Sequence, residues 1–122
     1  MAKKILIIDD EKQLIEMVKI RLEASGYFVI SVGDGVQGVS KAIEEQPDLI
    51  LLDVLMPKMD GYNTLDKLKG EAETKLIPVI MFTVERTPEK IKKSFEAGAE
   101  EHIIKPFDPE ELMTKIKKVL DD

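Results

Sequence analysis

Segment 48–61 constrains the fold of this chain most, because it joins a run of aliphatic residues to a single carboxylate. Residues 49–52 are all Leu or Ile, and they are followed by Asp53 and then by a Pro-x-x-Asp-Gly sequence. A short apolar run that ends in turn residues is typical of a buried parallel strand that breaks into a loop. Asp53 should therefore lie at the carboxyl edge of a sheet, where open α/β sheets bind ligands. The alternative is that Asp53 only caps the next turn.

Four further apolar segments extend this pattern to five strands that alternate with helices. The strands are predicted at residues 3–8, 28–32, 49–52, 79–83 and 102–104. Apolar residues recur at helical spacing between and after these strands, which predicts five helices. The residues expected to face inward are, helix by helix, Leu14, Val18 and Leu22; Val36, Val39 and Ile43; Leu65 and Leu68; Ile91 and Phe95; and Leu112, Ile116, Val119 and Leu120. Asp34 is expected to cap the second helix, and Thr87 with Pro88 to begin the fourth. This alternation predicts an α/β fold with a five-stranded parallel sheet and helices on both faces, and it leaves the strand order open.

The length and composition of the chain fit one folded domain. Of its 122 residues 43% are hydrophobic and 34% are charged, which is typical of a compact protein and too apolar for disorder. We therefore expect a single domain over residues 1–122. No cysteine is present, which excludes a disulfide framework and a thiolate metal site.

The net charge and the amino terminus limit the expected partners. A net charge of −6 argues against nucleic acid binding by this chain alone, because phosphate contacts require a concentrated basic face. The apolar run at residues 5–8 ends at Asp9, which makes it too short for a signal peptide or a membrane span. We expect a cytoplasmic protein that contacts neither nucleic acid nor a membrane directly.

Polar residues follow four of the five predicted strands. Asp9 and Asp10 come after the first, Asp53 after the third, Thr83 ends the fourth, and Lys105 follows the fifth. In a parallel sheet these strand ends open on one edge, where three carboxylates would repel one another unless a cation were present. One or two carboxylates, a backbone carbonyl and waters suit Mg²⁺. An Asp held beside Mg²⁺ and an ammonium is suited to accept a phosphoryl group as the nucleophile.

In this order and at these spacings, the residues closely resemble the receiver domain of two-component response regulators. The resemblance covers essentially the whole chain: an acidic pair, then Asp followed by x-x-Met-Pro-x-x-Asp-Gly, then a hydroxyl residue, then Lys-Pro-Phe. It implies that Asp53 is the phosphoacceptor and that Asp10, with Asp9, binds Mg²⁺. It also implies that Asp53 and the backbone carbonyl of Leu55 complete the protein ligands of the metal.

The same resemblance implies a switch and a topology. Thr83 would be the switch hydroxyl, and Lys105 would pair with the phosphoryl group ahead of a cis peptide bond to Pro106. The sheet would have the flavodoxin-like (βα)5 strand order 2-1-3-4-5.

The resemblance also implies a signalling role. The protein would take a phosphoryl group from a sensor histidine kinase or a phosphotransfer protein, and it would then change the surface formed by its fourth helix, fifth strand and fifth helix. That surface would control an unknown output partner or effector domain. The protein would catalyse its own phosphorylation and dephosphorylation without being a turnover enzyme, as a monomer or a weak phosphorylation-dependent dimer.

His102 departs from the pattern of this family, which commonly has Tyr or Phe three residues before the lysine. One hypothesis is that phosphorylation draws Thr83 inward and that His102 fills the vacated space. The alternative is that His102 is a surface residue without a switching role. Three other assignments also have plain alternatives: Asp9 or Asp10 as a helix cap only, and Thr83 as an ordinary β-branched strand residue.

Two other functions are compatible with the same fold. The first is a constitutive binding module in which the acidic edge is idle. The second is a flavin electron-transfer protein, which requires a phosphate-binding loop rich in glycine and hydroxyl groups after the first strand. The acidic residues 9–11 in that place would repel a phosphate.

Overall fold

A parallel sheet of five strands forms the centre of the molecule. The computed structural model describes residues 2–56 and 58–120, so Pro57, the first residue of the predicted turn after Asp53, lies outside the described residues. The strands are β1 (Lys4–Ile8), β2 (Phe28–Val32), β3 (Leu49–Asp53), β4 (Val79–Thr83) and β5 (Glu101–Ile104). They are all parallel, in the order β2-β1-β3-β4-β5. The predicted sheet and the strand order 2-1-3-4-5 are therefore confirmed.

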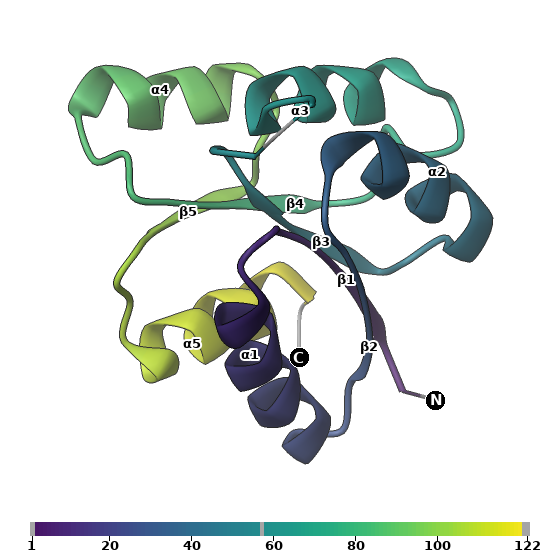
Figure 1. The fold of residues 1–122 in the computed structure, drawn as a ribbon, viewed down its shortest axis with the longest axis vertical. Helices are drawn as coiled ribbons and strands as arrows, with labels where there is room; N and C mark the ends of the chain where they lie inside the picture. Colours follow the sequence, from purple (N-terminus) through teal and green to yellow (C-terminus); the bar gives the residue numbers. More distant parts are fainter. Residues whose placement is uncertain (1, 57, 121–122) are drawn as a thin grey trace.

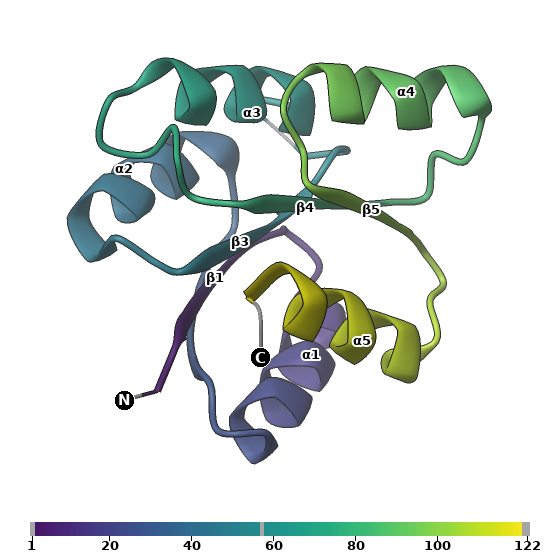
Figure 2. The same cartoon turned by 180° about the vertical axis from the view of Figure 1, so that it is seen from behind.

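Helices cover both faces of this sheet. They are α1 (Lys12–Ala24), α2 (Gly35–Glu45), α3 (Gly61–Gly70), α4 (Pro88–Glu96) and α5 (Pro109–Leu120). Helices α2, α3 and α4 lie on one face and α1 and α5 on the other (Figures 1 and 2). None of the helices in the described ranges has the length and the apolar character needed to cross a membrane.

Two hydrophobic cores lie against the two faces of the sheet. Alternate residues of β1 belong to different cores: Ile5 and Ile7 pack with α1 and α5, whereas Leu6 and Ile8 pack with α2 and α3. Every residue of β3 and β4 is buried. Because both faces of these strands are covered, they appear in the sequence as uninterrupted apolar runs.

Two helices begin with the predicted caps. The side chain of Asp34 accepts a hydrogen bond of 2.8 Å from the backbone N–H of Gln37 at the start of α2. Thr87 accepts one of 3.3 Å from the backbone N–H of Lys90, with Pro88 as the first residue of α4. Each cap satisfies one of the free N–H groups at a helix start.

The predicted inward face of α2 was wrong at two positions. Val36 and Ile43 are exposed, although Val39 is partly buried against the core. The buried residues of this helix are small ones, namely Gly35, Gly38 and Ala42. A Cβ atom on Gly38 would lie 2.5 Å from Cδ1 of Ile8. At Gly38 the helix lies too close to the sheet for a larger side chain to fit between them, and Val36 and Ile43 point outward.

The predicted inward face of α4 was also wrong at Phe95. This side chain is 45% exposed, whereas its neighbour Ser94 is fully buried. Ser94 and Phe95 follow Ile91 at the spacings that place helical residues on one face, so either of them could lie on the same face as Ile91. The small serine is the one that faces β5, and the phenyl ring lies on the outer side of the helix.

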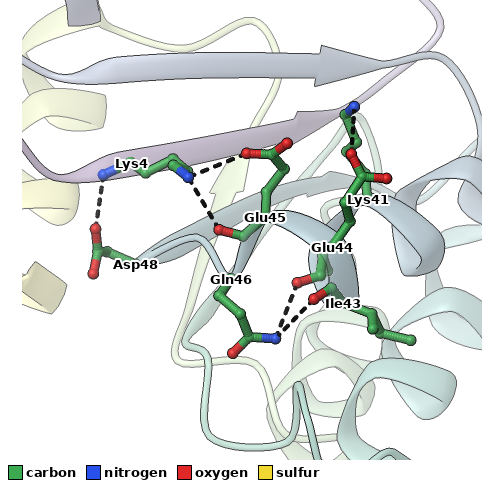
Figure 3. Close-up of polar contacts among 8 residues, drawn as sticks. Lys4, Lys41, Ile43, Glu44, Glu45, Gln46 and Asp48 are labelled. Carbon is green, nitrogen blue, oxygen red and sulfur yellow. Dashed lines mark hydrogen bonds and ion pairs between the residues drawn. The ribbon is translucent and has the colours of Figure 1, made fainter.

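The amino edge of the sheet contains a network of polar contacts (Figure 3). The Lys4 ammonium lies 3.1 Å from both the carbonyl oxygen and a carboxylate oxygen of Glu45, and the backbone N–H of Lys4 donates to Asp48 over 2.7 Å. The Gln46 side chain donates to the last carbonyl groups of α2 and, over 3.1 Å, to the Glu73 carbonyl. These contacts connect β1, the end of α2 and the start of β3 through paired charges and amide groups.

Candidate functional site

Three carboxylates meet at the carboxyl edge of the sheet. Asp9 and Asp10 follow β1, and Asp53 ends the neighbouring strand β3. One oxygen from each carboxylate lies within 4.8 Å of the other two. Asp9 is 1% exposed and Asp53 is 5% exposed, whereas Asp10 is open to solvent. The structure therefore brings together the three acidic residues that the sequence placed on one edge.

Lys105 places one ammonium group against this cluster. Its Nζ atom lies 2.9 Å from Asp9, 3.5 Å from Asp53 and 3.8 Å from Glu11. The side chain is buried, and its backbone N–H donates to the Thr83 carbonyl, which fixes its position beside β4. The peptide bond that follows Lys105 is cis. A single buried cation thus faces more negative charge than it neutralises.

Burial and repulsion raise the pKa of Asp53 to about 6. Desolvation of the carboxylate is the largest cause, and the negative charge of Asp9 is the next. The ammonium of Lys105 and the backbone N–H of Leu55 oppose the increase. Ionisation of Asp53 in the folded protein therefore costs free energy, and an additional cation nearby would reduce that cost.

The loop after β3 is held close to the start of α3. Asp53 accepts a hydrogen bond of 3.3 Å from the backbone N–H of Leu55, and the Gly61 N–H donates to the Val54 carbonyl over 2.7 Å. A Cβ atom on Gly61 would contact the carbonyl oxygen of Asp53 and would lie 2.5 Å from Cα of Val54. Glycine at this position allows α3 to begin directly against the residue that carries the central carboxylate. The Leu55 side chain points into solvent.

Asp9 is more than a local cap. One of its oxygens accepts the backbone N–H of Glu11 over 2.9 Å, while the other binds Lys105. The residue at the N-cap position of α1 is Glu11, whose side chain makes no capping bond. The reading of Asp9 as a helix cap only is therefore wrong.

Thr83 and His102 lie on the neighbouring strands β4 and β5. Both side chains are buried. The Thr83 hydroxyl accepts the backbone N–H of Glu85 over 3.2 Å. The ring of His102 lies 3.1 Å from the Ser94 hydroxyl through Nδ1 and 3.3 Å from the Glu85 carbonyl through Nε2. The alternative that His102 is a surface residue is wrong, and burial lowers the pKa of its ring.

Two residues in and beside the site were missed in the sequence. Glu11 lies within ion-pair distance of Lys105, and its place directly after the acidic pair was a signal for this position. Ser94 contacts His102 from α4. The only signal for Ser94 is its position three residues after Ile91, on the side of the helix that Phe95 was expected to occupy.

The donor set fits a hard divalent cation. The three carboxylates offer only oxygen ligands, two of them are buried, and burial together with the charge of Asp9 raises the pKa of Asp53. Carboxylates and waters are the ligands that Mg²⁺ prefers. A thiolate site is excluded because the chain has no cysteine.

Comparison with known proteins assigns the family. Residues 5–117 match the family described as "Response regulator receiver domain". The chain belongs to this family. Such domains accept phosphoryl groups in two-component signalling, bind Mg²⁺ at an acidic pocket and are in general not turnover enzymes. They interact with histidine kinases and output domains.

Individual relatives agree with this assignment. The chain is 38% identical over 117 residues, 96% of its length, to the DNA-binding dual master transcriptional regulator RpaA of Synechocystis sp., of which it covers 48%. The chain spans about half the length of the curated relatives that it matches.

Solved structures have the same fold along the entire chain. The chemotaxis response regulator CheY4 of Vibrio cholerae superposes with a TM-score of 0.92 at 33% identity, over 98% of this chain and 99% of that one. The receiver domain of sensor histidine kinase PA1611 from Pseudomonas aeruginosa has a TM-score of 0.91 at 25% identity, with 100% of both chains covered. That structure has a magnesium ion coordinated in its active site cleft.

Proposed function

We propose that this chain is a phosphorylation-dependent signalling switch in which Asp53 is the phosphoacceptor. The observation that supports this most directly is the convergence of Asp9, Asp10 and Asp53 on one edge of the sheet, with the Lys105 ammonium beside them. We take residues 1–122 as one receiver domain.

Transfer of a phosphoryl group to Asp53 requires only a nucleophile and groups that stabilise charge. An oxygen of the Asp53 carboxylate forms a bond to the phosphorus of a phosphorylated histidine on a kinase or a phosphotransfer protein. The bond between phosphorus and the imidazole nitrogen breaks, and the nitrogen keeps the electron pair. Lys105, which lies 3.5 Å from Asp53, would pair with the transferred group, and the Thr83 hydroxyl would donate a hydrogen bond to one of the phosphoryl oxygens.

Asp9, Asp10, Asp53 and the backbone carbonyl of Leu55 are the groups that would hold Mg²⁺. When bound, the ion supplies positive charge next to the oxygens of the phosphoryl group. Asp9 and Asp53 also orient Lys105 through their ion pairs. The positive charge of Lys105 lowers the pKa of Asp53 and so favours the ionised nucleophile, against the effects of burial and of Asp9.

The switch would run from Thr83 to the surface formed by α4, β5 and α5. Phosphorylation would draw the Thr83 hydroxyl toward the phosphoryl group, which changes its contact with Glu85. Glu85 also contacts His102, which belongs to β5. The changed surface would control an output partner or an effector domain, and the protein would act in the cytoplasm as a monomer or a weak phosphorylation-dependent dimer.

The test is chemical phosphorylation followed by intact mass measurement. Incubation with Mg²⁺ and acetyl phosphate is expected to add one phosphoryl group, and Asp53→Asn is expected to abolish the addition. Asp48→Asn, the same change at the opposite edge of the sheet, is the matched control and should be phosphorylated normally. An unmodified wild type, or equal modification of the Asp53→Asn variant, would refute the proposal and leave a binding module with an idle acidic edge.

A further inference from the structure

Ser94 is a buried polar residue of α4 with no role in the function proposed above. Among the nine residues of α4, all of which the structure describes, it is the only buried one. Its hydroxyl oxygen lies 3.1 Å from Nδ1 of His102 and 3.3 Å from the carbonyl oxygen of Lys90. Because little apolar surface of this short helix is buried, the polar contacts of Ser94 have a large share in fixing its position against β5.

The contacts of the ring select one tautomer of His102. Nε2 lies 3.3 Å from the Glu85 carbonyl, and a carbonyl oxygen only accepts hydrogen bonds, so Nε2 carries a proton. Burial lowers the pKa of His102 and favours the neutral ring. In a neutral ring with a proton on Nε2, Nδ1 is an acceptor, and the donor that faces it is the Ser94 hydroxyl. The single proton of the Ser94 hydroxyl is also within reach of the Lys90 carbonyl, at 3.3 Å. When this proton goes to Nδ1 instead, the Lys90 carbonyl still receives the Tyr62 hydroxyl, at 3.5 Å.

This pair of residues continues a series of contacts that begins at Thr83. The Glu85 N–H donates to the Thr83 hydroxyl, and the Glu85 carbonyl accepts from His102. Ser94 then connects His102 to α4. A displacement of the Thr83 side chain therefore acts on a residue, Glu85, that also holds the imidazole ring.

Helix α4 is also connected to α3, and the Tyr62 hydroxyl of α3 lies within hydrogen-bond reach of Ser94. The Tyr62 ring lies 4.1 Å from the Lys93 ammonium, and its hydroxyl donates to the Lys90 carbonyl. Glu85 forms a further ion pair with Lys90 at 3.6 Å. Polar groups of α3, of β5 and of the segment after β4 thus hold α4, and they have fewer compatible positions than an apolar contact because hydrogen bonds are directional.

We propose that Ser94 is a positioning residue that holds His102 in the tautomer with a proton on Nε2 and so connects α4 to β5 and to the segment after β4. The effect on signalling rests on the proposed function, because it assigns Thr83 as the switch hydroxyl. The tautomer does not depend on phosphorylation. Loss of the Ser94 hydroxyl would separate the movement of α4 from events at Asp53 and leave the acceptor chemistry intact.

The first test is nitrogen NMR of the His102 ring, the only histidine of the chain, in the full-length protein above pH 7. The wild type is expected to have a protonated Nε2 and an unprotonated Nδ1. Ser94→Ala should give a mixture of tautomers, and Ser40→Ala, which alters an exposed serine of α2, should leave the ring unchanged. A wild-type ring with its proton on Nδ1 would overturn the proposal without any variant.

The second test measures coupling by amide hydrogen exchange in α4, with and without acetyl phosphate and Mg²⁺. Loss of one hydrogen bond should speed exchange of the α4 amides about fivefold in Ser94→Ala, and the change on phosphorylation should be smaller than in the wild type. In a His102→Phe background, Ser94→Ala should have no further effect.

The outcomes separate the two proposals. Ser94→Ala should take up one phosphoryl group, as the wild type does. If this variant has a single ring tautomer and the phosphorylation response of the wild type, Ser94 only fills space. If the wild type takes up no phosphoryl group, the proposed function is refuted. The NMR measurement of the His102 tautomer still tests the role of Ser94 in that case.

Discussion

The two edges of the sheet carry charged side chains in opposite arrangements. At the amino edge, Lys4 and Glu45 form a partly exposed pair, and Asp48 accepts a backbone N–H. At the carboxyl edge, Asp9 and Asp53 share the buried ammonium of Lys105 with other acidic groups nearby. The amino edge satisfies its charges within the chain. The carboxyl edge leaves an excess of negative charge that an external cation would neutralise.

The largest expected difference between the edges concerns their lysines. Lys105→Met should lower the free energy of unfolding by about 3 kcal/mol at pH 8 in EDTA, because it leaves two buried carboxylates without their cation. Lys4→Met should cost about 1 kcal/mol or less, since its pair is partly exposed. Urea denaturation measures both values.

A second substitution controls for lost packing at Lys105. The Lys105→Met, Asp53→Asn double variant should regain most of the lost stability, because one of the repelling carboxylates is then neutral. Equal costs for the two single lysine variants would remove the distinction between the edges.

The next effect is the pH dependence that Asp53 causes. Its pKa is about 6 in the folded protein and 3.8 for an unperturbed aspartate, so the folded state binds the proton more tightly. The ionised group therefore destabilises the fold above pH 6, and this penalty disappears as the pH falls below about 4. Asp53→Asn should be more stable than the wild type by on the order of 2 kcal/mol at pH 8 in EDTA.

Measurement of unfolding free energies from pH 4 to pH 8 checks this prediction. The difference between Asp53→Asn and the wild type should shrink steadily toward the acid end of the range. A difference that is the same at every pH would mean that burial and repulsion of the carboxylate are not its cause.

Mg²⁺ should reduce the same penalty. At a free concentration ten times its dissociation constant, the ion should add about 1.4 kcal/mol to the stability of the wild type. Asp10→Asn should lose most of this gain, because it removes a proposed ligand and leaves Asp9, Asp53 and Lys105 in place. Lys4→Met is the matched control and should keep the full gain. Thermal unfolding at fixed Mg²⁺ concentrations measures it, and equal gains in all three proteins would place the ion elsewhere.

The residues at the carboxyl edge of the sheet could be predicted from the sequence, but some of the residues that the helices bury could not. Asp53 and Thr83 end buried apolar runs, and a parallel sheet brings the ends of such strands together. Errors occurred where close approach excludes large side chains, as at Phe95 on α4, because periodicity ranks apolar residues and ignores the space available. The strand order came from resemblance, since nothing in the alternation of elements encodes it. The contact of Ser94 with His102 joins residues from two elements, and a local pattern contains no information about such a pair.

The smallest expected effect uses the same substitution at both edges. Asp48→Asn keeps an oxygen that can accept the Lys4 N–H and removes only an exposed charge, so it should cost about 0.5 kcal/mol at pH 8. Asp53→Asn should instead stabilise the protein under the same conditions. The chemical change is identical, so the difference in sign comes from the environment: a carboxylate with a satisfied donor in solvent contributes stability, whereas a buried carboxylate facing other carboxylates costs stability. Urea denaturation of both variants in low and high salt checks this, because salt should weaken the exposed Asp48 effect more than that of the buried Asp53. Stabilisation by both substitutions would mean that overall negative charge, rather than the arrangement at one edge, destabilises the fold.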